Sequence, residues 1–492
     1  MRILVLSLLA GCTGFSLGEN TPGGDTWTDP PPTLDGEHHV GAIGVERDAS
    51  QAWVVHEATR GTETRATLSA IDPATGASTE VLDVTGTTDR RVVFPAVGRM
   101  LLMAQRGATE NLVLFDTTTR TRIASAVAPT WFWGTRTAPT GRAVVVADNQ
   151  DPHAPLHVID TTTLHHQVIP HGGDEIEAMW NHHADVLIAL SVTDPFGAHP
   201  SAKLLRYDLT GADLDQPLPA PTVATELAGY GWDFAFSFTW IGISPDDHWA
   251  VFPLIHRTAG GDDGEHVLLV LDQTTGQVSL VAGSGPVGFT ADSAQIVTYG
   301  AAPQVGGQPF HEDPWLVDPV THARTTVTMP FDAGITYFIS GDYLVVAPLS
   351  SDQVVIHDLA TTAEHLAVPT AQLDLHDFIS SPDHEELWLE TAGHVQVVGL
   401  SSGTVAPVAI PGSVGSINVA HDTALTADRV TASVSRTAIP ARSVLGTTAL
   451  PSPFTARPPA SLGFTSAAQV GAHGARLATR RAHDGDAISL DR

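Results

Sequence analysis

One short phrase recurs along this chain at intervals in the forties, and it constrains the fold more than any other feature. In its clearest copy, five apolar residues from Val267 to Leu271 are followed by Asp272 and a Thr-Thr-Gly turn that ends at Gly276. A short apolar run bounded by Asp and Gly is typical of a buried strand followed by a tight turn. The equivalent positions in the eight copies are Asp72, Asp116, Asp160, Asp208, Asp272, Asp318, Asp358 and Gly399.

The spacing of these copies predicts the fold class. Consecutive copies are 44, 44, 48, 64, 46, 40 and 41 residues apart. A period of this length with several strands per repeat is the signature of a β-propeller. We therefore predict an all-β protein, a β-propeller of four-stranded blades, with about eight well-marked repeats and up to ten. No long segment has helical periodicity, and the 44 glycines and 34 prolines suit short strands joined by turns.

The repeats predict the domain boundaries as well. The well-marked blades occupy residues 37–410, and weaker C-terminal repeats that complete the propeller occupy residues 411–492. Gly446 and Asp491 mark a possible ninth and tenth copy. One hypothesis is that the final strand of the chain closes the ring by completing the blade of the other terminus.

The repeated aspartates have a local structural explanation. A carboxylate at the end of a strand can accept the backbone N–H groups of the following turn, and a glycine supplies the positive φ that such a turn needs. We therefore interpret the seven aspartates as turn formers and not as catalytic residues.

A second turn phrase precedes the first in several repeats. Residues 244–246 and 381–383 both read Ser-Pro-Asp between apolar runs. They resemble the Ser-Pro-Asp-Gly hairpins of WD40-like and TolB-like propellers, and residues 70–76 are similar to the start of the repeat in YVTN/quinoprotein-type propellers. This resemblance implies the fold and leaves the activity open. Glu80 stands where the quinoprotein repeat has its docking tryptophan, so we expect no cofactor.

The N-terminus predicts an export signal. Arg2 supplies a positive charge, residues 3–9 are apolar, and Leu-Ala-Gly leads to Cys12, the only cysteine in the sequence. Such a stretch is too short to span a bilayer and is typical of a cleaved signal peptide, here residues 1–11. It resembles the lipobox of bacterial lipoproteins, in which the cysteine carries the lipid. The alternative is an ordinary secretory signal with an incidental cysteine.

The predicted location follows from this resemblance. Thr13, which follows the cysteine, is similar to what the sorting rule of enteric bacteria requires for the outer membrane. Residues 12–36 are rich in Pro and Gly and form a predicted linker. We expect a lipid-anchored protein of the cell envelope, on the periplasmic or the surface face. The net charge of −30 argues against binding to nucleic acid or to anionic lipid.

The longest interval between copies, 64 residues, contains a distinctive aromatic stretch. Aromatic residues alternate with small or polar ones, so all the rings lie on one face of a strand. This face is either a packing surface between blades or a platform for a partner. The five residues are Trp232, Phe234, Phe236, Phe238 and Trp240.

Histidines are frequent, but their spacing matches no zinc motif. We interpret the region that contains them as a solvated acidic loop between blades, and we predict no metal site. The residues concerned are His165, His166, His171, His182 and His183, with Asp174, Glu175 and Glu177 among them.

Two functions remain open. The first is a non-catalytic scaffold that binds an envelope protein or glycan; by resemblance, the lipoprotein propeller of the outer-membrane β-barrel assembly machinery is one example of such a role. The second is a propeller enzyme, a lyase or hydrolase, whose acids and bases meet at the central channel. Converging groups with shifted pKa values would favour the enzyme, and an exposed apolar patch would favour the scaffold.

Overall fold

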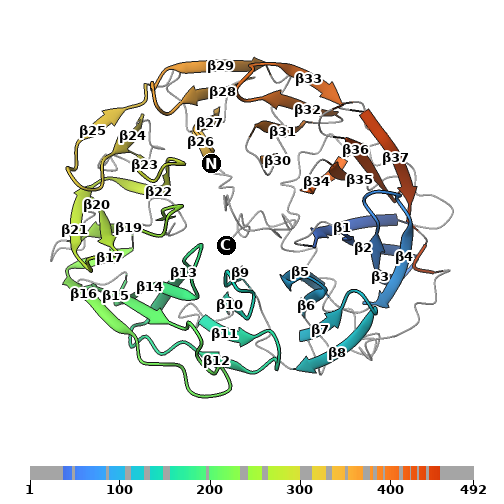
Figure 1. Ribbon diagram of the computed structural model, residues 1–492, viewed down its shortest axis with the longest axis horizontal. Coiled ribbons are helices and arrows are strands. Elements are labelled where there is room, and N and C mark those ends of the chain that lie inside the picture. Colours follow the sequence, from blue (N-terminus) through green and yellow to red (C-terminus); the bar gives the residue numbers. More distant parts are fainter. Residues whose placement is uncertain are drawn as a thin grey trace. The chain divides into compact units, whose positions relative to one another are not determined.

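The computed structural model describes residues 37–454 apart from short internal segments. These segments are 47–49, 85–87, 106–111, 127–132, 148–155, 196–198, 233–241, 258–263, 300–312, 329–334, 349–352, 370–376, 381–384, 392–393, 409–413, 421–422, 429–431, 439–440, 442 and 451. The described residues form 37 strands and no helix, arranged in nine antiparallel sheets. They confirm the predicted all-β fold, a β-propeller of four-stranded blades (Figure 1). Accordingly, no helix in this part of the chain is long and apolar enough to cross a membrane.

Four blades, from the described residues of 37–126 and 377–449, belong to one compact unit. Blade 1 contains β1 (Glu37–Val45), β2 (Ala52–Arg60), β3 (Glu63–Ile71) and β4 (Ser78–Asp83). Blade 2 contains β5 (Thr88–Ala96), β6 (Arg99–Gln105), β7 (Leu112–Asp116) and β8 (Thr121–Ala126). Blade 8 contains β30 (Asp377–Ser380), β31 (Glu386–Thr391), β32 (His394–Gly399) and β33 (Val405–Val408). Blade 9 contains β34 (Val414–Ala420), β35 (Thr423–Asp428), β36 (Ser433–Ala438) and β37 (Ser443–Ala449).

Five blades belong to a second unit, built from Trp131–Leu373. Blade 3 contains β9 (Trp133–Thr137), β10 (Ala143–Ala147), β11 (Leu156–Asp160) and β12 (His166–Val168). Blade 4 contains β13 (Glu175–Trp180), β14 (Val186–Thr193), β15 (Ser201–Asp208) and β16 (Thr222–Ala228). Blade 5 contains β17 (Tyr230–Trp232) and β18 (Gly242–Ile243), which both pair with β19 (Trp249–His256), then β20 (His266–Asp272) and β21 (Val278–Ala282). Blade 6 contains β22 (Ser284–Phe289), β23 (Ile296–Tyr299), β24 (Pro314–Val317) and β25 (Arg324–Thr326). Blade 7 contains β26 (Ile335–Ser340), β27 (Tyr343–Pro348), β28 (Gln353–Asp358) and β29 (Glu364–Pro369).

The hydrophobic core of each unit lies between the faces of neighbouring blades. Trp53 of blade 1 packs edge-on against Phe115 of blade 2, with ring centroids 6.0 Å apart, inside one continuous buried cluster. Similar clusters lie between blades 3 and 4, 4 and 5, 5 and 6, and 6 and 7. The second and third strands of a blade are apolar on both faces because a neighbouring blade covers each face.

Within the first unit, the last blade packs directly against the first. Val40 and Val54 of blade 1 share a buried cluster with Leu425 and Val434 of blade 9. The strand β37 stays in its own sheet, so the described residues join the two blades by packing and not by exchange of a strand. Gly446 lies inside β37 and not at a turn, while the possible tenth copy at Asp491 lies outside the described residues.

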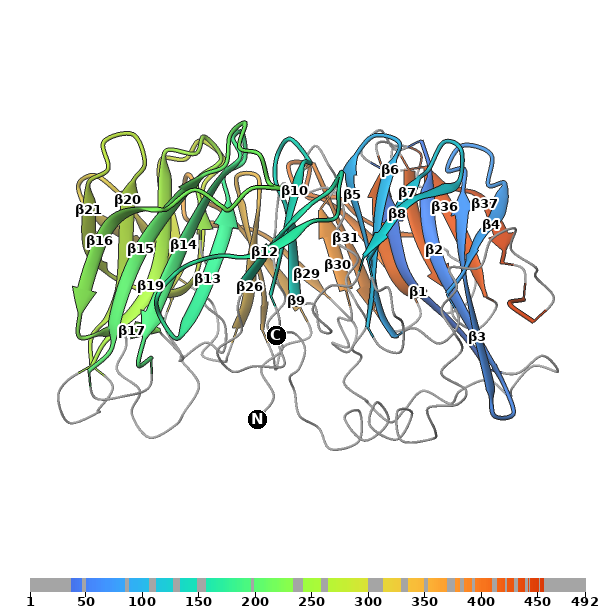
Figure 2. The same cartoon turned by 90° about the horizontal axis from the view of Figure 1, so that it is seen from below.

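The chain continues past β37 onto blade 1. The β2–β3 hairpin projects beyond the neighbouring strands of its unit (Figure 2). The ring of Phe454 lies beneath two arginines of this hairpin, 4.5 Å from the guanidinium carbon of Arg60 and 5.3 Å from that of Arg65. These cation–π contacts add a second connection between the last blade and the first.

In the second unit, the long loop between β15 and β16 folds back over blade 3. Leu214 is buried in the cluster between blades 3 and 4. Gln167 of β12 donates to the carbonyls of Leu214 and Gln216 at 2.6 and 2.7 Å, and Thr163 donates to Asp215 at 2.8 Å. This loop accounts for part of the long interval after Asp208.

Candidate functional site

All seven repeat aspartates accept backbone hydrogen bonds from the turns that follow them. The distances between Oδ1 and a turn nitrogen lie between 2.6 and 3.1 Å, for Asp72 (Ala74), Asp116 (Thr119), Asp160 (Thr162), Asp208 (Thr210), Asp272 (Thr274), Asp318 (Val320) and Asp358 (Thr361). The backbone N–H of Thr321 is the main reason why the pKa of Asp318 is lowered. A carboxylate held ionised in this way is a poor general acid. The structure therefore confirms their interpretation as turn formers.

Each of these turns, and the turn after Gly399, contains a residue with a positive φ, whether or not it is glycine; this residue is the third after Asp208 and the fourth in every other copy. The glycines are Gly76, Gly211, Gly276 and Gly403, with φ of 76°, 68°, 73° and 65°. The other residues are Arg120, Leu164, His322 and Thr362, with φ of 57°, 62°, 59° and 58°. The turn geometry is thus imposed by the repeat, and four non-glycine residues bear its conformational cost.

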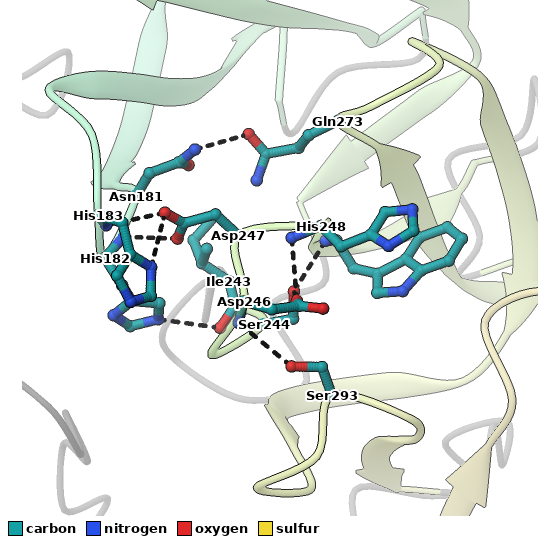
Figure 3. Close-up of polar contacts among 11 residues, drawn as sticks. Asn181, His182, His183, Ile243, Ser244, Asp246, Asp247, His248, Gln273 and Ser293 are labelled. Atoms are coloured by element: carbon teal, nitrogen blue, oxygen red, sulfur yellow. Dashed lines mark hydrogen bonds and ion pairs between the residues drawn. The ribbon is translucent and has the colours of Figure 1, made fainter.

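A polar network joins the turns of neighbouring blades in the second unit (Figure 3). The carboxylate of Asp247, in the turn between β18 and β19, accepts the backbone N–H of His182 at 2.5 Å and that of His183 at 2.8 Å. The Nδ1 atom of His183 lies 3.2 Å from the same carboxylate. Asp247 itself has a φ of 61°. One carboxylate therefore fixes the turn that follows β13 onto blade 5.

The same arrangement continues to the blades on both sides. In one direction, Thr140 of blade 3 donates through its hydroxyl and its backbone N–H to Asp185 of blade 4, at 2.5 and 3.2 Å. In the other direction, the backbone N–H of Asp246 in blade 5 donates to the hydroxyl of Ser293 in blade 6 at 3.2 Å. The turns between the first and second strands of blades 3 to 6 are thus connected in series. We call this set of contacts the turn network.

Three further contacts reinforce the turn network in blade 5. The ring of His248 stacks on Trp249, with centroids 4.5 Å apart and an interplanar angle of 8°, and its Nε2 lies 3.3 Å from Asp272. The side chain of Asn181 donates to Gln273 at 3.0 Å (Figure 3). Sequence reasoning missed the pairs His248–Asp272 and Asn181–Gln273 because the partners come from different strands or blades and are far apart in the chain.

The histidine region is therefore more ordered than a solvated loop. His182 and His183 anchor the turn network, although the side chain of His183 stays 70% exposed. The Nδ1 atom of His171 lies 3.1 Å from the hydroxyl of Ser191 and accepts the N–H of Gly173 at 3.3 Å. Ser191 is buried, so this Ser–His pair offers no accessible nucleophile. No group of three His, Cys, Asp or Glu side chains that could hold a metal ion occurs in the described part of the chain.

An ion pair connects the first strands of blades 3 and 4. Arg136 on β9 places Nη2 3.1 Å from Oε1 of Glu177 on β13, and it also donates to the carbonyl of Ala178. The indole of Trp180 donates to the carbonyl of Arg136 at 3.0 Å. Burial raises the pKa of Glu177, and the positive charge of Arg136 opposes this shift. The two side chains are 21% and 35% exposed, so solvent reaches the pair.

The pKa of Glu177 is shifted upwards, in the opposite direction to the shift at repeat aspartates such as Asp318. A partly exposed carboxyl with a raised pKa can act as a general acid or base. Its hydrogen-bonding partner is an arginine, which stays charged and cannot exchange protons. The geometry therefore supplies one half of an acid–base site. Glu177 is among the acids that the sequence places near the histidines, whereas no local pattern marks Arg136.

The structure describes one of the predicted site residues. Trp232 is 3% exposed and packs in the cluster between blades 4 and 5. Phe234, Phe236, Phe238 and Trp240 lie outside the described residues, as does Cys12.

Comparisons with known proteins extend only to the fold. No family model matches the sequence, and no curated protein matches it. A eukaryotic initiation factor is similar with a TM-score of 0.52 and 11% identity, over 78% of this chain and 93% of that chain. Dipeptidyl peptidase 4 from Porphyromonas gingivalis has a TM-score of 0.49 and 10% identity, over 74% of this chain and 60% of that chain. BamB from Moraxella catarrhalis has a TM-score of 0.42 and 11% identity, over 70% and 95%. At these identities the likeness shows the fold alone.

Proposed function

We propose that this protein is a non-catalytic, lipid-anchored β-propeller of the bacterial cell envelope that binds a protein or glycan partner. The lipid is attached at Cys12, and the linker of residues 12–36 separates the blades from the outer membrane. The lipobox-like end of the signal sequence supports the anchor, and Thr13 supports the choice of membrane.

One observation carries the choice of a scaffold over an enzyme: the carboxylates of the described turns hold the backbone. Asp247 fixes two N–H groups of a neighbouring blade, and Asp185 fixes the turn of another. Hydrogen bonds of this kind occupy the carboxylate oxygens, so these side chains serve the structure of the turns and are not free to contact a substrate. Turns that are fixed across several blades form a rigid surface, which lowers the entropy cost of binding a partner.

The proposal is tested by crosslinking and capture of the full chain from its native membranes, with Cys12→Ala as the unanchored form. Ser16→Ala, a change in the same linker, serves as the matched control. We expect the parent chain and the Ser16→Ala variant to sediment with membranes and to capture the same envelope protein or glycan. Cys12→Ala should remain soluble and lose that capture. Equal membrane association of all three chains would refute lipidation at Cys12.

The ion pair of Arg136 and Glu177 favours a second candidate function, a propeller lyase or hydrolase that acts at the first strands of blades 3 and 4. Its support is the raised pKa of Glu177 together with solvent access. A screen of polysaccharide and peptide substrates tests this function. Glu177→Gln is the test variant, and Glu226→Gln, at an exposed position, is its matched control. Turnover that Glu177→Gln abolishes, and that Glu226→Gln preserves, would establish the enzyme.

A further inference from the structure

We propose that the outer edge of β21 in blade 5 is a docking site for an extended, cationic peptide segment of a partner protein, which adds to the blade as a new outer strand. This inference rests on the proposed scaffold function and assigns it a contact surface. Strand addition of this kind gives affinity through main-chain hydrogen bonds and specificity through alternate side chains.

The fourth strand is the outer edge of every blade, and most of these edges are protected against strand addition. Five of them contain a β-bulge, in which one extra residue is inserted into the pairing register with the third strand. These residues are Val81 in β4, Ile123 in β8, Ala224 in β16, His365 in β29 and Leu445 in β37. A bulge at an edge breaks the regular row of backbone groups that another strand needs.

Three further edges are protected by their length or composition. The strands β12 and β25 contain three residues each, and β33 contains four, including Pro407. A strand this short offers few hydrogen bonds to a partner, and proline removes a donor.

The remaining edge, β21, lacks each of these protections. It has five residues, Val-Ser-Leu-Val-Ala, with no charge and no proline. Its register with β20 is continuous from the pair of Leu271 and Val278 to the pair of Val267 and Ala282. Leu280, in the middle of the strand, is 37% exposed. An exposed, regular and apolar edge is the kind of strand that pairs with another chain.

The hydrogen bonds at the two ends of β21 show which backbone groups point outward. The backbone N–H of Asp272 donates to the carbonyl of Gln277 at 2.9 Å, and the backbone N–H of Gly283 donates to the carbonyl of His266 at 3.4 Å. In an antiparallel ladder, hydrogen-bonded and non-hydrogen-bonded residue pairs alternate. Between these two ends, the backbone N–H and C=O groups that point towards β20 are therefore those of Ser279 and Val281. The outward groups are therefore those of Val278, Leu280 and Ala282. Among the described strands, none pairs with this edge.

Charge identifies the occupant. The whole chain has a net charge of −30, and the turns that follow the third strands of blades 5 and 6 carry Asp272 and Asp318. A second copy of the chain would bring two strongly acidic bodies together. Five residues from each copy also bury far less than the roughly 1,000 Å² that a specific interface between folded proteins needs. A flexible, positively charged segment is not repelled by the acidic chain and does not need the large interface of two folded proteins. The negative charge of this protein attracts such a segment.

The test measures binding of a fluorescent nine-residue peptide of alternating Val and Lys to the full chain. Leu280→Pro removes one outward N–H and leaves the hydrogen bonds to β20 in place. Leu280→Lys provides a second variant that retains the backbone, and Ile123→Lys, at an exposed position on the bulged edge of β8, is the matched control. A Val-Glu peptide and an N-methylated Val-Lys peptide control for charge and for main-chain bonding.

We expect the Val-Lys peptide to bind the parent chain and the Ile123→Lys variant equally, and both Leu280 variants about tenfold more weakly. Binding should slow amide hydrogen exchange at Val278, Leu280 and Ala282. Equal binding by the folded Leu280 variants, or equal binding of the N-methylated peptide, would overturn the assignment. Capture of an envelope partner that both Leu280 variants retain would leave the scaffold function intact and refute this edge as its site.

Discussion

Arg436 makes the most specific contact between the last blade and the first, and we expect its removal to open this joint. Its side chain is buried, and Nη1 donates to the carbonyl of Pro73 at 2.9 Å and to that of Ala74. The guanidinium lies between two glycines: a Cβ at Gly76 would lie 2.8 Å from Nε, and a Cβ at Gly446 would lie 3.0 Å from Nη2. The contact joins residues that are 363 positions apart.

The expected loss of stability follows from these bonds. Arg436→Met keeps most of the apolar stem but removes two hydrogen bonds from a charged donor, each worth about 1.5–3 kcal/mol, and leaves the carbonyl of the buried Pro73 unpaired. Part of this loss is offset because the buried charge no longer has to be desolvated. We therefore expect the free energy of unfolding to fall by about 2–4 kcal/mol. Arg436→Lys keeps the charge without the planar fork and should lose about half as much.

Urea denaturation monitored by tryptophan fluorescence measures this change, and hydrogen exchange locates it in blades 1 and 9. The matched control is Arg65→Met, because the Arg65 side chain is exposed and its contacts, to Glu63 in the same hairpin and to the ring of Phe454, lie at the surface; its cost should stay below about 1 kcal/mol. Gly76→Ala should also destabilise the joint, but less in the Arg436→Met background, where the clash with Nε is absent. Equal unfolding midpoints for Arg436→Met and Arg65→Met would refute this account.

Three further predictions concern single positions. His357 occupies the buried repeat position that Leu271 fills in blade 5, and burial lowers its pKa from a usual value of 6.5. His357 is therefore neutral in the fold, and the free energy of unfolding should decrease as the pH falls below 6.5. In urea titrations between pH 5 and 7, His357→Leu should remove this pH dependence and raise the free energy of unfolding by about 1 kcal/mol at pH 7. An unchanged pH dependence in the variant would contradict this prediction. Thr362 and Gly276 both have a positive φ, so Thr362→Gly should raise the free energy of unfolding by about 1 kcal/mol and Gly276→Ala should lower it by a similar amount, as measured by thermal unfolding. A loss of stability in Thr362→Gly would exclude backbone strain at this position. Asparagine tolerates the positive φ of position 247, but Asp247→Asn weakens two hydrogen bonds between blades. The variant should therefore lose about 1–2 kcal/mol in free energy of unfolding and show faster hydrogen exchange in the turn before β14. Faster exchange in other turns only would argue against the turn network.

The features that could be predicted from the sequence are those in which the determining residues are close together. Asp272 and Gly276 define their turn within five residues, so the repeat revealed the strand before it and the turn after it. The ninth blade gave only a weak signal because the third strand of that blade, β36, is followed by no Asp-Thr-Gly phrase. Its presence depends on packing against blade 1, which no local pattern encodes.

The candidate site was less predictable because its contacts join different blades. Asp247 holds residues that are 64 and 65 positions away, and Arg136 contacts a carboxylate 41 positions away. Spacing within one repeat gives no information on which turns meet across the face of a neighbouring blade. Trp232 is buried, but the alternation of aromatic residues is compatible both with a packing face and with a binding platform, so the pattern alone could not decide between them.

The blades of a repeat protein can be compared with one another, because each has an outer edge strand with unpaired backbone groups and the blades differ in how that edge is protected. Eight outer edges are short, bulged or interrupted by proline, whereas β21 is regular and uncharged. Regularity at this edge contributes nothing to the pairing within the described sheets, since none of the described strands pairs with the outward N–H and C=O groups of Val278, Leu280 and Ala282. It is a liability for an isolated protein, which gains a risk of unspecific strand pairing. A partner strand would remove that liability by satisfying the same groups, and for this reason β21 is a stronger candidate for the binding surface than the turns, whose polar groups already hold one another.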